Sequence, residues 1–209
     1  MKITDKVCLF WSDEDVFSNF YPAPITLSFS EATRLWGEFT VPTSEHAFMF
    51  YKAMYFDDVI TAEQIINEPR PYGAKKLGRS VKNFNVEIWD QESLSVMYYV
   101  NTLKYQDSVL AQVLIDTGDR LIAEASPYDK IWGIGLSEDD PKALDPTLWR
   151  GENHLGNVLM KIRKILTVER RVNNPALSKH FLRETNETSH HLCQRTDQVI
   201  YLPRWPYSP

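Results

Sequence analysis

Hydrophobic residues near the N-terminus fall in short runs separated by turn formers. Residues 7–11, 25–29 and 35–41 are rich in Val, Ile, Phe, Trp and Thr, and prolines separate the first two runs. This pattern predicts short strands joined by turns, arranged as a small antiparallel meander. Residues 120–125 fit a further short strand.

The middle of the chain follows a helical period. From Ser44 to about Gly118 apolar residues recur every three or four positions, with a break at Pro69 and Pro71. Gly118 is suited to end the last of these helices. The clearest apolar stripe consists of Trp89, Leu94, Val96, Met97, Val100 and Leu103.

A final helix is expected after Asn153, which is a good helix cap. Its buried face is predicted to contain Leu155, Val158, Leu159, Ile162 and Leu166. After about Arg171 the pattern breaks into Ser, Thr, Asn and Pro, which predicts a tail over 171–209 that is irregular or packed on the surface. Residues 1–170 are then one helix-rich α+β domain with a small antiparallel sheet.

Composition supports one well-packed domain. The chain has 209 residues, of which 43% are hydrophobic and 12% aromatic, enough for a dense core. Its formal net charge of -5 argues against a broad basic surface that coats nucleic acid. Any nucleotide partner is therefore expected to be held locally.

No cofactor, metal or membrane partner is expected from the sequence. Cys8 and Cys193 lie far apart without metal-ligand spacing, and residues 1–6 contain no apolar signal core. No run approaches the roughly 18 apolar residues of a membrane span. We expect an intracellular, cytoplasmic protein, or a nuclear one in a eukaryote, and leave its oligomeric state open.

The segment from Thr43 to Lys52 contains the first candidate catalytic residues. Glu45 and Lys52 are seven residues apart, so on a helix they lie on nearly the same face as Phe48. An acid and an amine against aromatic surface are costly to bury unless they pair or perform chemistry. The alternative is structural, with Glu45 favoured by the helix dipole and the Lys52 stem lying along the core.

Three loops have the composition of a pocket for a planar ligand, because each mixes aromatic residues, turn formers and amide or acid groups. They cover residues 17–22, 128–135 and 149–156. Their candidate ligand-contacting residues are Asn19, Phe20, Asp129, Trp132, Gly133, Gly135 and Asn153.

Each of these residues also has a structural interpretation. Asn19 and Asn153 suit an Asx-turn and a helix cap, and Trp132 suits a core plug beside a glycine turn. Arg79, after Gly78, suits either a phosphate clamp or the exposed end of a helix. Cys8 is a poor nucleophile because it lies in an apolar strand.

The ordered set of motifs resembles the NADAR family over about residues 8–166. No GxSxG, HExxH or P-loop motif competes with this resemblance. The motifs are Phe17–Phe20, Pro42–Phe48 with Lys52, Ala74–Arg79, Trp89, Val96–Met97, Leu103–Tyr105, Trp132–Gly135 and Gly151–Met160. The chain departs from the family pattern at Ala47, Met49 and Tyr105 and in its tail.

The resemblance implies a helix-rich α+β hydrolase of N-glycosidic bonds without a cofactor. Substrates in the family are ADP-ribose attached to the amino group of guanine in nucleic acid and phosphoribosylamino-pyrimidine intermediates of riboflavin synthesis. We favour the ADP-ribosylated guanine nucleotide or nucleic acid, because no fused riboflavin-pathway domain is apparent. The alternative from another class is a module that binds ADP-ribose or a nucleotide without cleaving it.

A mechanism follows as a hypothesis from the shared chemistry of these substrates, an amine on the anomeric carbon. Glu45 would transfer the proton, and Lys52 would stabilise charge or attack the opened imine as a Schiff base. The remaining roles are assigned by position in the motifs. Phe20 and Trp132 would flank the base, and Trp89 would also be part of the substrate site. Asn19 and Asn153 would bond the base or ribose, and Asp129 would orient the ribose or water. Gly133 and Gly135 would let the backbone approach a phosphate or base, and Arg79 would contact a phosphate.

Overall fold

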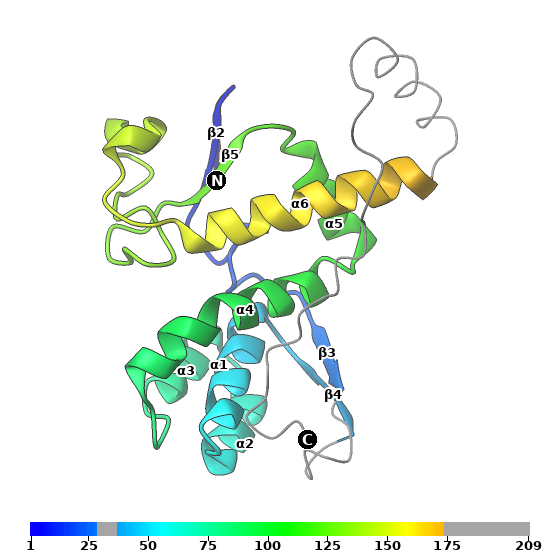
Figure 1. Cartoon of the computed structure of the whole chain (residues 1–209), viewed down its shortest axis with the longest axis vertical. Helices are drawn as coiled ribbons and strands as arrows, with labels where there is room; N and C mark the ends of the chain where they lie inside the picture. Colours follow the sequence, from blue (N-terminus) through cyan, green and yellow to red (C-terminus); the bar gives the residue numbers. More distant parts are fainter. Residues whose placement is uncertain (29–36, 174–209) are drawn as a thin grey trace.

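The computed structural model describes residues 1–28 and 37–173, which form a helix-rich α+β domain (Figure 1). The expected fold class is confirmed. The strands are β1 (Lys2–Ile3), β2 (Val7–Phe10), β3 (Ile25–Ser28), β4 (Glu38–Val41) and β5 (Leu121–Glu124). The α-helices are α1 (Ser44–Tyr55), α2 (Val59–Asn67), α3 (Pro71–Gly78), α4 (Val86–Lys104), α5 (Ser108–Asp116) and α6 (His154–Asn173), with 3₁₀ turns at Pro141–Leu144 and Pro146–Leu148.

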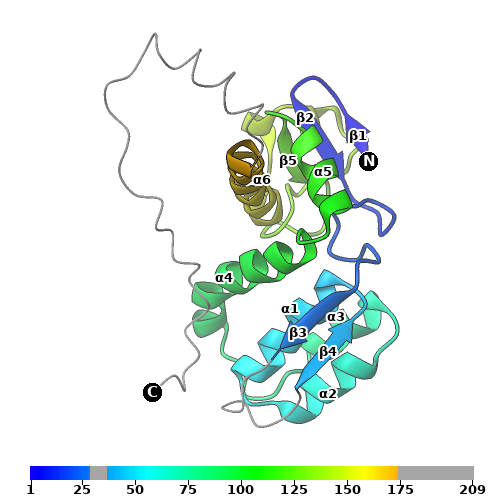
Figure 2. The same cartoon turned by 90° about the vertical axis from the view of Figure 1, so that its right-hand side faces the viewer.

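The domain has two lobes that meet along α4 (Figures 1 and 2). One lobe contains β1, β2 and β5 with α5 and α6, and the other contains α1, α2 and α3 with β3 and β4. Helix α4 packs on α6 in the first lobe and on α1 in the second. The long helix therefore joins two small lobes that could each bury little surface alone.

The strands form two separate sheets, so the predicted three-stranded meander is wrong. β3 and β4 are antiparallel, with Ile25 opposite Val41, as expected. β2 instead pairs in parallel with β5, and β1 adds to it antiparallel. All four residues of β2 are buried, which is typical of a strand covered on both faces. Short apolar runs do not reveal their pairing partner, and the segment 29–36 lies outside the described residues.

Most helix predictions are confirmed. Trp89, Val96 and Val100 are buried along α4, and Gly118 follows α5 with φ +60, as a C-terminal glycine should. Leu94 is the exception, since it is 44% exposed and lies off the buried stripe. In α6 the predicted face is buried at Leu155, Val158, Leu159 and Ile162. The predicted tail, with Cys193, lies largely outside the described residues.

Successive side chains of β2 point into two different hydrophobic clusters. Cys8 and Phe10 face a large cluster that extends through both lobes, whereas Val7 and Leu9 face a smaller one with Ala123, Ala125, Ile134, Leu136 and Ala143. Burial raises the pKa of the Cys8 thiol to about 11, which disfavours a thiolate nucleophile there. Within the described ranges, no helix is both long and apolar enough to cross a bilayer.

Candidate functional site

Helix α1 places Glu45 in its first turn and inside the protein. Thr43 is the N-cap, and its hydroxyl accepts a hydrogen bond from the His46 amide. The Glu45 amide donates to the carbonyl of Asn19 at 2.9 Å. Glu45 is buried at 4% exposure, and within residues 1–28 and 37–173 its Oε1 has no hydrogen-bond partner. A buried carboxylate without a partner is expected to bind a ligand or hold a proton.

The electrostatics of Glu45 are dominated by burial. Desolvation raises the pKa of Glu45 to about 7, and the negative charge of Asp129 adds to the rise. Three cations oppose it, the strongest being Lys75, followed by Arg79 and then Lys52. The predicted acid therefore lies among the predicted cations, but its strongest partner is a lysine of α3 that was not a candidate.

A second carboxylate, that of Glu124, belongs to the same site. Glu124 is the half-buried last residue of β5, and its enclosed Oε2 also has no hydrogen-bond partner among the described residues. Burial raises its pKa to about 7, with further rises from Asp129 and from Glu45. Sequence reasoning missed Glu124, although an acid that ends an apolar strand, Leu-Ile-Ala-Glu, was a usable signal.

Asn153 holds the end of β5 where Glu124 lies. Its Oδ1 accepts a hydrogen bond from the Glu124 amide at 3.2 Å, and its Nδ2 donates to the Ile122 carbonyl at 2.9 Å. The residue is buried and has φ +52, a conformation that asparagine tolerates better than most residues. Asn153 precedes α6, as predicted, but its amide is engaged with β5 and not with an open ligand site.

The loop after β5 is shaped by Asp129. Its Oδ1 accepts hydrogen bonds from the amides of Ile131 and Trp132, at 2.9 and 2.8 Å. This turn places the Trp132 ring 5.4 Å from that of Phe48, nearly perpendicular to it. Trp132 thus contacts the other lobe at the site, and the negative charge of Asp129 raises the pKa of both Glu45 and Glu124.

Both loop glycines are required by close packing. A Cβ on Gly133 would lie 2.8 Å from the carbonyl oxygen of Glu124, and Gly135 has φ +67 beside Arg150. The two glycines therefore let the loop fold back onto β5. Their contacts within the protein explain them without a ligand.

Lys52 lies among aromatic rings. Its Nζ is 4.0 Å from the centre of the Phe84 ring and 5.9 Å from that of Trp89. Burial and the charge of Arg79 lower its pKa, and Glu45 opposes this only weakly. Trp89 is itself packed in the core against Phe48, with ring centres 5.4 Å apart. Lys52 and Glu45 therefore share a helix and an electrostatic environment, without a direct ion pair.

Helix α3 brings two cations to the carboxylates. Proline at position 71 starts the helix, and Gly78 lets it lie directly against Met49 of α1, where any Cβ would clash. Lys75 lies on the same face as Arg79, and its Nζ is 5.5 Å from the centre of the Phe20 ring. Phe20 therefore lies beside Lys75, and its role as a ligand contact stays a prediction.

The side chain of Asn19 points into the core. Its Nδ2 contacts the sulfur of Met97 at 3.1 Å, and its Oδ1 accepts from Asn101. The loop is fixed by buried Lys104, whose Nζ donates to the carbonyls of Val16 and Ser18 at 2.6 and 2.8 Å. Asn19 therefore reaches the site through its backbone carbonyl, which accepts from Glu45.

The site that emerges combines two orphaned carboxylates, nearby cations and aromatic walls. Its carboxylates come from different lobes, Glu45 from α1 and Glu124 from β5. The described residues contain no group of three or more His, Cys, Asp or Glu side chains arranged to hold a metal ion. Such a site can donate and accept protons beside an anionic ligand.

The family model of the NADAR domain matches residues 9–167. Protein irg-1 of Caenorhabditis elegans is 37% identical over 166 residues, which cover 76% of this chain and 78% of that protein. An N-glycosidase of Acanthamoeba polyphaga mimivirus is 41% identical over 123 residues, covering 58% and 72%. The NMR structure of E. coli YbiA superposes with a TM-score of 0.62 at 28% identity, covering 81% of this chain and 89% of YbiA.

Proposed function

Because the chain belongs to the NADAR family, we propose that it is an N-glycosidase that cleaves the bond between ribose C1 and an exocyclic amine. The preferred substrate is guanine ADP-ribosylated on its amino group, in nucleic acid. The observation that carries the proposal is the pair of carboxylates Glu45 and Glu124, each with an enclosed oxygen that has no partner in the part of the chain that the structure describes. A site of this kind is suited to moving protons and not to packing.

The two carboxylates supply an acid and a base at neutral pH. The pKa of each is about 7, and the charge of Glu45 adds to the rise at Glu124. Because the charge of Glu45 disfavours ionisation of Glu124, we assign one proton to the two carboxylates near pH 7. The protonated group can donate to the substrate while the ionised group activates water.

The chemical step begins with proton donation from Glu45 to the ribose ring oxygen. The C1–O4′ bond then breaks, and the nitrogen lone pair forms a C1=N iminium with the base. Water, deprotonated by Glu124, adds to C1. Glu124 then returns this proton to the departing amine as the C1–N bond breaks, and the C1 hydroxyl gives its proton to Glu45 to leave a C1 aldehyde. The 4′-hydroxyl closes the ring on this aldehyde to give free ADP-ribose.

Lys52 provides a covalent variant of the same reaction. If it loses its proton, its Nζ adds to C1 of the iminium, the base leaves as an amine, and water hydrolyses the resulting Schiff base. The lowered pKa of Lys52 supports this route. Its position over Phe84 supports the simpler role of a fixed positive charge.

The α3 cations suit the diphosphate of ADP-ribose. Lys75 and Arg79 lie on one helical face beside Glu45, and two cations match two phosphates better than the single phosphate of a phosphoribosylamino-pyrimidine. Phe20 and Trp132 provide aromatic surface for a planar base. Asn19 and Asn153 have no place in this proposal as direct ligands, since their amides bond within the protein.

Release of ADP-ribose tests the proposal. The protein is incubated with a single-stranded oligonucleotide that carries one ADP-ribosylated guanine, and free ADP-ribose is measured by chromatography. We expect multiple turnovers and an intact oligonucleotide. A tight complex without release would support a binding module instead, and turnover only of phosphoribosylamino-pyrimidines would support the riboflavin-type substrate.

Borohydride trapping tests the covalent route. Sodium borohydride added during turnover would reduce a Schiff base to a stable adduct on Lys52, detectable by mass spectrometry. The Lys52→Met variant should then lose nearly all activity. Active enzyme without an adduct, together with turnover by the variant, would rule out the covalent route and leave acid–base catalysis.

A further inference from the structure

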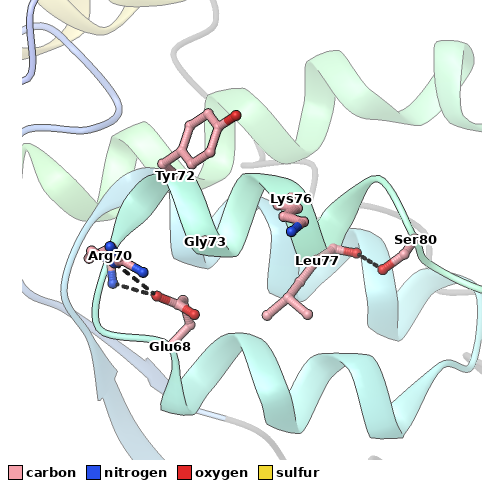
Figure 3. A pocket seen from close by; sticks show the side chains of 7 residues that line it. All are labelled: Glu68, Arg70, Tyr72, Gly73, Lys76, Leu77 and Ser80. Atoms are coloured by element: carbon pink, nitrogen blue, oxygen red, sulfur yellow. Dashed lines mark hydrogen bonds and ion pairs between the residues drawn. The ribbon is translucent and has the colours of Figure 1, made fainter.

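An open groove follows α3, from Glu68 before the helix to Ser80 after it (Figure 3). Its volume is about 540 Å³. Its lining residues are Glu68, Arg70, Tyr72, Gly73, Lys76, Leu77 and Ser80. Lys76 directly follows Lys75, the strongest cation at Glu45, so the groove and the site lie on different faces of one short helix.

The groove is lined by two cations, Arg70 and Lys76, that belong to a basic segment of an acidic protein. Residues 70–82 contain no acid, whereas the whole chain has a net charge of -5. The five cations of this segment are Arg70, Lys75, Lys76, Arg79 and Lys82. Because the protein as a whole is negatively charged, a locally positive segment favours a polyanionic partner there.

Glu68, the acid that lines the groove, does not neutralise the exposed charge of Arg70. Glu68 accepts a hydrogen bond from the Arg70 amide at 3.1 Å, and its carboxylate is 3.8 Å from the Arg70 Nε. The Glu68 side chain is 22% exposed, against 82% for Arg70. The arginine can therefore turn to a phosphate in solution while Glu68 remains against the backbone of α3.

An exposed aromatic ring accompanies these cations. Tyr72 is 68% exposed, and in Figure 3 its ring projects clear of the α3 ribbon. Grooves that bind single-stranded nucleic acid combine cations that contact phosphates with aromatic rings on which bases stack. Arg70, Lys76 and Tyr72 reproduce this combination within seven residues.

We propose that this groove binds the phosphate backbone of the single strand that flanks the modified guanine. The inference rests on the proposed function for the identity of the strand and extends it to a second contact surface. A helix is about 10 Å across, and phosphates of a stacked strand are about 3.4 Å apart. A strand whose guanine is at Glu45 would therefore reach Lys76 within about three or four nucleotides.

A single strand fits better than a duplex. The amino group of guanine faces the minor groove of a duplex, where it is also engaged in base pairing. An enzyme that acts on it must extrude the base, which costs least when the base is unpaired. The open groove and exposed tyrosine are suited to unstacked bases in a way that a duplex surface would not use.

Salt-dependent binding tests the groove. The affinity of a fluorescent, unmodified 12-nucleotide single strand is measured by anisotropy between 50 and 200 mM salt, for wild-type protein and R70E/K76E. Loss of two phosphate contacts should lower the slope of log K against log salt by about 1.4. The control is K6E/K142E, which changes the net charge by the same amount at two exposed lysines of the other lobe. Apart from the effect of net charge, this control should bind the strand with the affinity of the wild type.

Turnover separates this inference from the proposed function. R70E/K76E should lose at least tenfold in kcat/KM on the ADP-ribosylated oligonucleotide but keep wild-type rates on ADP-ribosylated guanosine. Tyr72→Ala, which alters no charge, should weaken strand binding about tenfold with an unchanged salt slope. Circular dichroism confirms that each variant is folded, and Tyr72→Ala gives an independent result if R70E/K76E is not.

Distinct results would overturn each idea. Equal strand binding by wild type, R70E/K76E and Tyr72→Ala would refute the groove, as would equal losses in the two charge-reversal proteins. Absence of ADP-ribose release by the wild type would refute the proposed function, whereas the strand-binding comparison would remain decisive for the groove. Equal losses on the oligonucleotide and on the guanosine would show that the groove variants damage the site itself.

Discussion

Glu45 shows how burial overrides a local preference. An acid in the first turn of a helix is normally stabilised in its charged form by the helix dipole, an effect of about 0.3–1 kcal/mol. Here desolvation is larger and raises the pKa of Glu45 to about 7, despite three nearby cations. The Glu45 carboxyl thus keeps its proton at higher pH than an exposed glutamate because of where the helix lies, and not because of the helix alone.

Replacing either orphaned carboxylate should abolish most activity without unfolding the protein. Glu45→Gln and Glu124→Gln keep the shape of the side chain but remove the proton transfer, so kcat should fall about 10²–10⁴-fold. The free energy of unfolding should not decrease, since a neutral amide is less costly to bury than a carboxylate. The measurements are ADP-ribose release and urea unfolding.

Glu63→Gln is the matched control, because Glu63 is exposed on α2. It should match wild type in both measurements. Near-normal kcat in Glu124→Gln would remove this residue from the catalytic pair and leave Glu45 to act with water alone.

At the scale of elements, the junction of β5 with α6 decides where Glu124 lies. Asn153 bonds two backbone groups of β5, and a Cβ on Gly156 would clash with the Ile122 carbonyl. The helix can approach the strand this closely because it has a glycine in its first turn. Because α6 lies this close to β5, the Asn153 side-chain amide can hydrogen-bond to the backbone of Ile122 and Glu124.

Asn153→Ala should therefore reduce both stability and activity. It leaves the buried Glu124 amide and Ile122 carbonyl unpaired, each costing about 1–3 kcal/mol, and adds about 1 kcal/mol of strain at φ +52. Asn153→Gly relieves the strain but not the lost bonds, so it should be less destabilising by about 1 kcal/mol. Urea unfolding measures both differences.

A positioning role predicts more than lost stability. In Asn153→Gly the pH profile of kcat should shift, because Glu124 is no longer held at its place beside Glu45. A profile identical to wild type, at reduced stability, would show that Asn153 supports the fold without positioning the carboxylate.

At the scale of the whole molecule, the buried carboxylates should make stability fall as pH rises. Their pKa is about 7 in the folded protein, against an ordinary value of 4.5. Between these values the folded state retains protons that the unfolded state has lost, so the free energy of unfolding decreases from about pH 4.5 to 7. The decrease is at most on the order of 3 kcal/mol for each group.

Urea unfolding at pH 5, 6 and 7 measures this decrease. The double variant Glu45→Gln/Glu124→Gln should lose it, since neither amide titrates. Above pH 7 buried Lys104 has the opposite effect, because its pKa is lowered to about 7 and the unfolded state binds the extra proton. A wild-type stability that does not fall over this range relative to the double variant would contradict the assigned proton states.

Much of the fold was predictable because it depends on local spacing. The α4 and α6 stripes, the cap before α1 and the glycine after α5 follow from side chains within a few turns of each other. The pairing of β2 with β5 did not, since more than a hundred residues separate strands whose apolar runs look alike. Leu94 was wrongly predicted to be buried, because the side of α4 on which it lies is exposed to solvent.

The residues of the candidate site were also only partly predictable from the sequence. Composition and motif order identified Glu45, Lys52, Asp129, Phe20, Arg79 and Trp132 as candidates, because acids, cations and aromatics stand out within short segments. Glu124 and Lys75 joined them only when the folded chain brought the end of β5 and helix α3 close enough to interact with Glu45. Asn19 and Asn153 turned inward because tertiary contacts supplied partners for their amides.

The sequence alone determined the helices, their caps, the family resemblance and the chemical types available for the reaction, since these depend on neighbours along the chain. Tertiary structure decided which carboxylates lose their water and which cations lie near them. Desolvation and Coulomb interactions depend on distance in space, so the proton states of Glu45 and Glu124 exist only in the assembled domain.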